Sequence, residues 1–266
     1  MIMNFRKYTL SLCLVFFSPV IFAMSDEDLA KQLTNPVANL TTVPFQANYD
    51  HHYNVKDTGH ETYVNFQPVL PFELNSDWLL ISRTILPLID QVNILPGSGT
   101  QVGTGDTLQS FFLSPISPSG GIIWGVGPAI QVPTGMQQLL GSGKWAIGPT
   151  PVILKMAGPW TIGLLGHQIW SFAGSAGRPA ISQAYLQPFI AYTTKTAWTI
   201  TLNSESTFDW KLNEWDIPFN FQVTKLFKVG HQPISVGGGM RYWASTPQTA
   251  QKDFGLRLIV TFLFPN

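Results

Sequence analysis

The stretch EWDIPFNFQVTK, from Glu214 to Lys225, alternates between large apolar and mostly polar residues. The apolar set comprises Trp215, Ile217, Phe219, Phe221 and Val223. Successive side chains of a β-strand point to opposite faces of a sheet, so a period of two predicts a strand with one apolar and one polar face. The stretch has 12 residues, whereas strands of soluble domains usually have about 5–6. A tilted strand that crosses a membrane needs about 9–11 residues, so the length favours a membrane-spanning strand.

The same alternation recurs along most of the chain. It is clear in Glu61–Leu74, in Ala197–Glu205 and in the last stretch, 253–264. Weaker examples, together with strands expected just after Val43 and within 234–244, cover the remaining segments: 77–91, 107–117, 122–132, 144–156, 160–173 and 182–194. The sequence therefore predicts an all-β fold, a transmembrane antiparallel up-and-down β-barrel of about 12 strands. Merging or splitting one hairpin would give about 10 or 14 strands instead.

The connections between these strands alternate in length. Residues 50–60 form a long connection and residues 75–77 a short one, and further long connections follow at 91–106 and 133–143. Outer-membrane barrels have long extracellular loops and short periplasmic turns, and an even strand number brings both termini to the periplasm. A soluble β-sandwich with long strands is the alternative, but that fold gives no reason for such regular alternation.

The composition agrees with a barrel in lipid. Charged residues make up only 11% of the chain, with 15 Lys and Arg against 15 Asp and Glu, whereas soluble domains carry about 25%. A lipid-facing Arg or Lys at mid-bilayer costs about 2–4 kcal/mol, which explains the low content. The balanced charge disfavours nucleic acid, which selects a basic face. Tryptophans expected near strand ends, where an interfacial belt forms, are Trp78, Trp145, Trp160, Trp198, Trp215 and Trp243.

The first residues are typical of an export signal. Arg6 and Lys7 precede an apolar run, and Ala23 offers a small residue at the cleavage position. We therefore expect residues 1–23 to be a signal peptide cleaved after Ala23, with an uncleaved anchor as the alternative. The apolar run is shorter than the about 20 residues of a spanning helix. The only cysteine, Cys13, falls in this segment, so the exported chain cannot rely on disulfides.

Residues 24–42 contain the only helical spacing in the chain. Leu29 and Leu33 lie four residues apart, and Pro36 then interrupts the pattern. This segment is expected to be either a periplasmic tail or a plug that enters the lumen and restricts traffic. Residues 43–266 are expected to form the outer-membrane barrel.

Four sequence blocks carry a family resemblance: NPVANL (35–40), WGVGP (124–128), LGSGKWAIGP (140–149) and QIWSFAG (168–174). Together they resemble the outer-membrane transporter family named for the meta pathway of phenol degradation (the MetA-pathway of phenol degradation family). The resemblance extends over nearly the whole exported chain. It implies a Gram-negative outer-membrane barrel that passes small molecules, aromatic ones among them. The C-terminus departs from the usual barrel ending on an aromatic residue, because Pro265 and Asn266 follow Phe264.

The polar face of the strands is expected to line the lumen. In a lumen, such groups form a constriction that selects solutes by charge and size. Alternatively, inward charges pair across a small barrel and fill it, which leaves a structural barrel without a pore. The candidate lumen and selectivity residues are Glu73, Arg83, Gln109, Gln131, His167, Glu205, Arg241 and Arg257.

Two groups of residues that could suggest a bound ligand lack the required pattern. Gly141–Lys144 does not have the phosphate-loop spacing, because a tryptophan follows the lysine. It is better interpreted as a loop that returns to a strand. His51, His52 and His60 fall in the first long connection without tight metal-ligand spacing. No metal or cofactor is therefore expected.

His167 and Ser171 could suggest a hydrolase, but four residues along a strand place them roughly 13 Å apart. That is too far for direct activation of the serine, so no catalytic residue is predicted. The expected function is passive, selective uptake of small, aromatic or apolar molecules through the lumen. The alternatives are a non-conducting structural or adhesive barrel and a membrane-embedded lipid hydrolase. Expected partners are outer-membrane lipid, a small solute and the barrel-assembly machinery.

Overall fold

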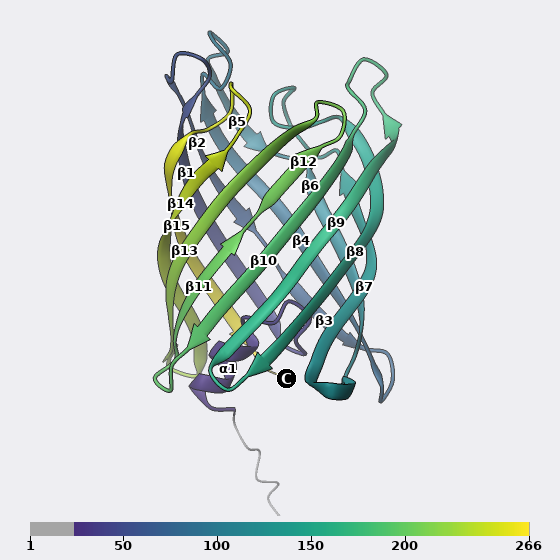
Figure 1. Cartoon of the computed structure of the whole chain (residues 1–266), viewed down its shortest axis with the longest axis vertical. Coiled ribbons are helices and arrows are strands. Elements are labelled where there is room, and N and C mark those ends of the chain that lie inside the picture. Colours follow the sequence, from purple (N-terminus) through teal and green to yellow (C-terminus); the bar gives the residue numbers. More distant parts are fainter. Residues whose placement is uncertain (1–23, 266) are drawn as a thin grey trace, which may run out of the picture.

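The computed structural model describes residues 24–265, which form a closed antiparallel β-barrel with one short helix (Figure 1). The predicted signal peptide, residues 1–23, lies outside the described residues. In chain order, the elements are α1 (Asp26–Gln32), β1 (Thr41–Tyr53), β2 (Gly59–Phe66), β3 (Val69–Glu73), β4 (Trp78–Val92), β5 (Thr100–Thr104), β6 (Thr107–Pro115), the 3-10 turn η1 (Ser119–Gly121), β7 (Ile122–Val132), β8 (Lys144–Ala157), β9 (Trp160–Gly174), β10 (Ser182–Thr193), β11 (Trp198–Ser204), β12 (Ser206–Asp209), β13 (Glu214–Val229), β14 (Gln232–Ser245) and β15 (Asp253–Phe264).

The 15 strand segments make 12 barrel strands, because three barrel strands are interrupted. β2 and β3 keep one register against β4 on either side of Gln67 and Pro68, and proline has no N–H for the ladder. β11 and β12 likewise keep one register against β13 around Glu205. β5 and β6 both pair with β4, with a break at Gly105 and Asp106. β15 pairs with β1 and closes the barrel, so the predicted fold is confirmed.

The connections also follow the predicted alternation, and both described ends of the chain lie at one end of the barrel (Figure 1). We call this the plug end. It carries short turns such as 158–159 and 230–231, whereas longer connections such as 133–143 and 246–252 lie at the opposite, loop end. The connection within 91–106 is shorter than predicted because β5 occupies part of it. This strand was missed because its segment is rich in glycine and has only one large apolar residue, Val102.

The inward and outward faces have opposite character. On β11, the outward Trp198, Ile200 and Leu202 are exposed, whereas the inward Thr199 and Asn203 are buried. A water-soluble protein buries its large apolar side chains instead, so this pattern fits an apolar surrounding. Within residues 24–265, no helix is long and apolar enough to cross a membrane.

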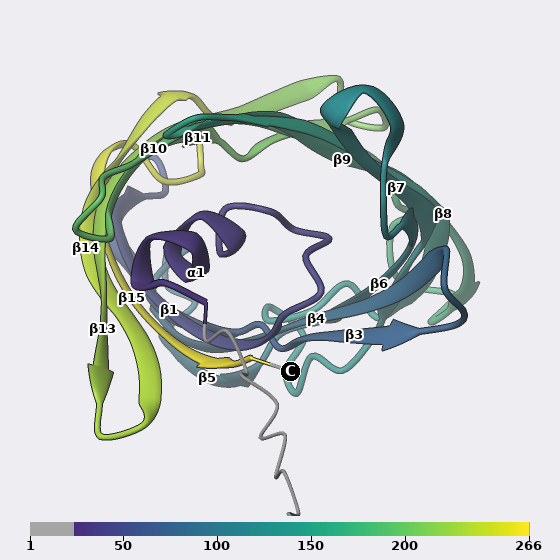
Figure 2. The same ribbon diagram turned by 90° about the horizontal axis from the view of Figure 1, so that it is seen from below.

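Seen along its axis, the barrel is flattened, with β13 and β14 at one end of the long dimension and β7 and β8 at the other (Figure 2). A glycine permits close strand contact at each end. A Cβ at Gly148 on β8 would collide with the carbonyl oxygen of Gln168, and one at Gly237 on β14 with that of Val223. Only glycine allows the backbones to approach this closely.

The N-terminal segment lies inside the barrel at the plug end (Figure 2). We call residues 26–40 the plug segment. Its helix begins after Ser25, whose side chain accepts a hydrogen bond from the N–H of Asp28, and its first turn is acidic, which suits a helix N-terminus. The chain then turns back to enter β1, so the segment occupies the interior of the barrel at this end.

The plug segment packs against two opposite parts of the wall. Leu29 and Leu40 form one apolar cluster with Leu226 of β13 and Leu263 of β15. On the other side, Val37 joins a second cluster with inward residues of four strands: Leu79, Ile81, Phe112, Val152, Leu154 and Leu165. Burial of these side chains stabilises the segment at about 25 cal/mol per Å² of apolar surface. The segment therefore bridges the lumen.

Candidate functional site: the barrel lumen

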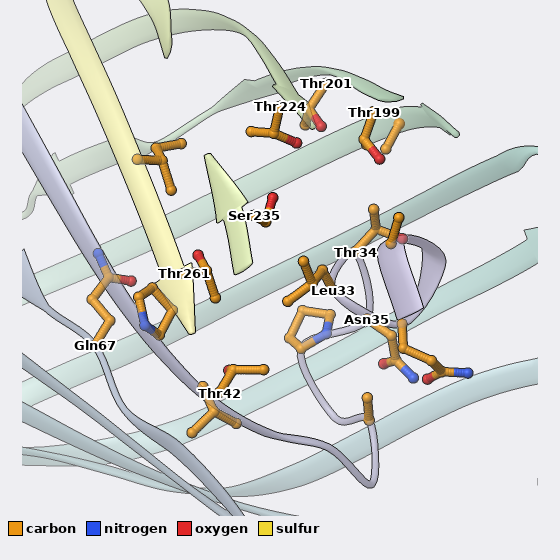
Figure 3. A pocket seen from close by; sticks show the side chains of 18 of the residues that line it. Leu33, Thr34, Asn35, Thr42, Gln67, Thr199, Thr201, Thr224, Ser235 and Thr261 are labelled. Atoms are coloured by element: carbon orange, nitrogen blue, oxygen red, sulfur yellow. The ribbon is translucent and has the colours of Figure 1, made fainter. Parts of the chain in front are cut away.

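The interior contains two adjoining cavities. One, of about 250 Å³, lies between the plug segment and the wall (Figure 3). The other, of about 380 Å³, extends towards the loop end. We call the residues that line both cavities the waist: Gln46, Gln67, Arg83, Gln187, Asn203, Gln222 and Ile259. The lumen is therefore two chambers that meet at a ring of mostly amide side chains.

The plug-end cavity has a wall rich in hydroxyl groups. Six of the lining residues on β1, β11, β13, β14 and β15 are Thr or Ser (Figure 3): Thr42, Thr199, Thr201, Thr224, Ser235 and Thr261. Each hydroxyl can donate and accept a hydrogen bond without carrying charge. This surface suits an uncharged or singly charged solute that forms hydrogen bonds.

The loop-end cavity combines apolar and polar side chains. Leu165 and Ile169 of β9 face it beside His167, whose ring stacks on that of Tyr185 with centroids 4.9 Å apart and an interplanar angle of 13°. Gln131 also lines it and donates to Asp106 at 3.1 Å. A solute with an apolar body and a polar end would find both kinds of contact here.

Beside this cavity, two arginines and two carboxylates form a buried ion-pair network. Arg257 donates to both carboxylate oxygens of Glu205 at 2.8 Å, and Arg241 donates to Asp50 at 2.7 Å. Arg241 also lies 4.0 Å from Glu205 and donates to the hydroxyl of Tyr63. The four charges sum to zero, as a buried network requires. Both arginines are only 2% exposed, so they lie in the wall rather than free in the lumen.

The structure brings most of the predicted lumen residues to the interior. Arg83, Gln131, His167 and Glu205 line the cavities. The paired arginines described above adjoin them. Glu73 lies at the plug end, where its carboxylate accepts from Asn39 at 2.7 Å.

The predicted position of Gln109 is wrong. Its neighbours Leu108 and Ser110 line the loop-end cavity, so the side chain of Gln109 points outward. There its amide bonds to the hydroxyls of Thr84 at 2.6 Å and Ser82 at 3.0 Å. The prediction failed because it assumed that polar residues face inward, and the inward face of β6 is partly apolar.

The amides of the waist were not among the predicted site residues. They are uncharged, and the prediction favoured charged groups. The period-two pattern could have found them, because residues two apart on a strand share one face. Asn203 shares the face of Glu205, and Gln222 belongs to the polar face of 214–225. Asp50, the partner of Arg241, was also missed, because it was placed in a loop rather than in β1.

The block LGSGK anchors a loop to the barrel. Asp106 accepts from the N–H of Gly135 at 3.1 Å and of Ser142 at 2.7 Å. Arg178 donates to the carbonyl oxygens of Gln138 at 2.8 Å and Ser142 at 3.0 Å, and to that of Gly141. β8 starts at Lys144, so the block is a loop that returns to a strand, as predicted.

The histidines of the first connection lie in strands, contrary to the prediction, because β1 and β2 extend further than expected. His51 and His52 belong to β1 and His60 to β2. His52 bonds to Asp253 at 2.7 Å. Within residues 24–265, no group of three or more His, Cys, Asp or Glu side chains could hold a metal ion.

His167 and Ser171 do not form a nucleophile–base pair in the described chain. The Ser171 hydroxyl accepts from the N–H of Ile181 at 2.9 Å, while the His167 ring stacks on Tyr185. A nucleophile and its base must be within hydrogen-bond reach. These contacts give no support to a hydrolase built on this pair.

The fold is similar to solved outer-membrane barrels. The outer-membrane channel from Pseudomonas putida F1 matches with a TM-score of 0.66 and 15% identity, over 85% of this chain and 96% of that one. Outer membrane phospholipase A from Escherichia coli matches with a TM-score of 0.48 and 10% identity, over 91% and 99%. A FadL homologue from Pseudomonas aeruginosa matches with a TM-score of 0.40 and 9% identity, over 86% and 91%.

No protein-family model and no curated protein sequence matches the chain. The superposition on the Pseudomonas putida channel shows the fold: this chain is a 12-stranded β-barrel of the outer-membrane type. The resemblance of the sequence blocks to the phenol-degradation family stays a prediction.

Proposed function

We propose that the chain is a channel of the bacterial outer membrane, for passive and selective uptake of small molecules through the lumen. The observation that carries this proposal is the pair of adjoining cavities, which lead from the loop end through the waist to the plug segment. A purely structural barrel of this size would be filled by its own side chains. With a signal peptide cleaved after Ala23 and termini in the periplasm, transport runs from the loop end inward.

The solutes we propose are small and can be aromatic or apolar in their main body. The loop-end cavity offers Leu165, Ile169 and the stacked rings of His167 and Tyr185 to such a body. The hydroxyl-lined cavity then favours molecules with at least one hydrogen-bonding group. The fold of the Pseudomonas putida protein, which is an outer-membrane channel, is compatible with this role.

The plug segment is the proposed restriction. It contacts opposite walls through apolar clusters, and Asp26 forms an ion pair with Lys228 at 3.0 Å. These contacts restrict the periplasmic side. A solute therefore passes only if the segment moves, or through a narrow passage beside it. Small and apolar solutes are favoured by such a restriction.

Conductance in planar bilayers tests both parts of the proposal. The exported chain should give small currents, and a variant lacking residues 26–39 should give currents several-fold larger. Equal currents would overturn the role of the plug segment. If neither protein conducts ions or passes sugars in liposome-swelling assays, the channel proposal fails and a structural or adhesive barrel is supported.

A further inference from the structure

Arg83 of β4 is unlike the other inward arginines because most of its donors are unused. A guanidinium group has five N–H donors. Within residues 24–265, Arg83 makes one hydrogen bond, from Nη2 to Oε1 of Gln67 at 3.3 Å, which is slightly longer than the usual N–H···O distance of about 2.7–3.2 Å. In contrast, Arg257 makes three hydrogen bonds, and Arg241 is held by Asp50, Tyr63 and Asn220.

The carboxylates nearby are committed to other partners. Glu205 is held by both terminal nitrogens of Arg257. Asp106 accepts from the backbone and side chain of Ser142 and from Gly135. In the described chain, no carboxylate oxygen lies within ion-pair distance of Arg83. Its charge is therefore available to a ligand in the lumen.

The amides around Arg83 add further donors. Gln67 and Asn203 each accept a hydrogen bond through the side-chain oxygen, which leaves their NH₂ groups for other partners. Within the described residues, the Gln187 side chain makes no hydrogen bond, and the Gln222 side-chain oxygen is buried without one. The NH₂ groups of these four amides are therefore unused donors in the part of the chain that the structure describes. Buried polar groups are usually paired, so unused donors beside a cation indicate a ligand with acceptor oxygens.

We infer that Arg83 and the amides of the waist form a binding site for a small carboxylate monoanion. Arginine binds a carboxylate through two parallel N–H···O bonds, and amide NH₂ groups can complete its coordination. A single unpaired cation matches one negative charge. The apolar residues of the loop-end cavity, Leu165 and Ile169, would receive the body of the molecule. This inference rests on the proposed channel function and names the class of solute.

Benzoate is the probe, and benzyl alcohol is its neutral counterpart. Titration of the purified, detergent-solubilised chain by calorimetry should show benzoate binding that weakens at least tenfold in Arg83→Gln. Arg83→Lys, which keeps the charge and loses the paired geometry, should give an intermediate affinity. The control is Lys155→Gln, which removes the same charge from an exposed position on the outward face of β8 and should leave the affinity unchanged.

Three outcomes would overturn the inference: equal affinity in Arg83→Gln, equal binding of benzyl alcohol, or equal binding of inorganic phosphate, which would indicate an unselective anion site. Heat-modified mobility on gels verifies that each variant is folded. Binding and flux are separate measurements. Benzoate binding without flux would contradict the channel proposal alone, whereas flux of neutral solutes without Arg83-dependent binding would contradict this inference alone.

Discussion

The hydroxyl of Thr34 in the plug segment lies 2.8 Å from the hydroxyl of Thr161 on β9. The two residues are 127 positions apart, and this contact joins the segment to the wall next to the turn at 158–159. Because the only cysteine of the sequence is Cys13, a new disulfide between these positions would have no competing thiol once the signal is removed.

The double variant Thr34→Cys with Thr161→Cys should therefore lock the plug segment reversibly. Under oxidation, the conductance should fall to a low and steady level, and a reducing agent should restore it to that of the unmodified chain. Each single variant is the control and should not respond to redox conditions. If the conductance of the oxidised double variant equals that of the unmodified chain, passage does not require the segment to move.

Replacing Gly148 tests the close contact at one end of the flattened barrel. A Cβ there would meet the carbonyl oxygen of Gln168, and the backbone cannot withdraw without disturbing β8 and β9. Gly148→Ala should lower the free energy of unfolding by about 1–3 kcal/mol, as overpacking does. Gly177→Ala is the matched control, since a Cβ there meets no atom within 4 Å. Urea unfolding followed by tryptophan fluorescence measures both, and equal values would disprove the close-contact explanation.

The barrel could be predicted because its signal is local. Within 214–225, period-two alternation and length identify a spanning strand without knowledge of its neighbours. The position of Gln109 shows the limit. Polarity alone assigned it to the lumen, but its outward position follows from the register of β6 against β4, where Gln109 pairs with Thr84.

The candidate site could be predicted only in part, because it depends on contacts between distant strands. Arg83, Arg241 and Arg257 are equivalent in sequence, as inward arginines on long strands. Only the fold shows that two of them find carboxylates while Arg83 does not. The waist combines residues from Gln46 to Ile259, and nothing in the local sequence places them at one height.

At the loop end, Lys252 donates to the carboxylate of Asp57 at 2.8 Å. This hydrogen bond lowers the pKa of Asp57 below its ordinary value. A lowered pKa means that the contact favours the folded loop at neutral pH and is lost as the pH falls through the folded-state pKa. Lys252→Gln should raise the pKa of Asp57 towards about 3.9, measured by carbon NMR of the carboxyl group. Lys228→Gln at the plug end is the control, and an unmoved pKa in Lys252→Gln would contradict the assignment.

The ion pair of Glu205 and Arg257 should be costly to break from one side. Glu205→Gln leaves Arg257 buried without its counter-charge, which typically costs about 3–5 kcal/mol. The double variant Glu205→Leu with Arg257→Met removes both charges. Its loss of unfolding free energy should be smaller than the sum of the losses in the single variants Glu205→Leu and Arg257→Met. Glu27→Gln is the control, because it breaks the Glu27–Lys31 pair on α1, 2.7 Å apart and partly exposed, and helix pairs of this type contribute about 0.3–0.5 kcal/mol. Urea unfolding in lipid vesicles gives the coupling energy, and additive losses would show that the two charges do not stabilise each other.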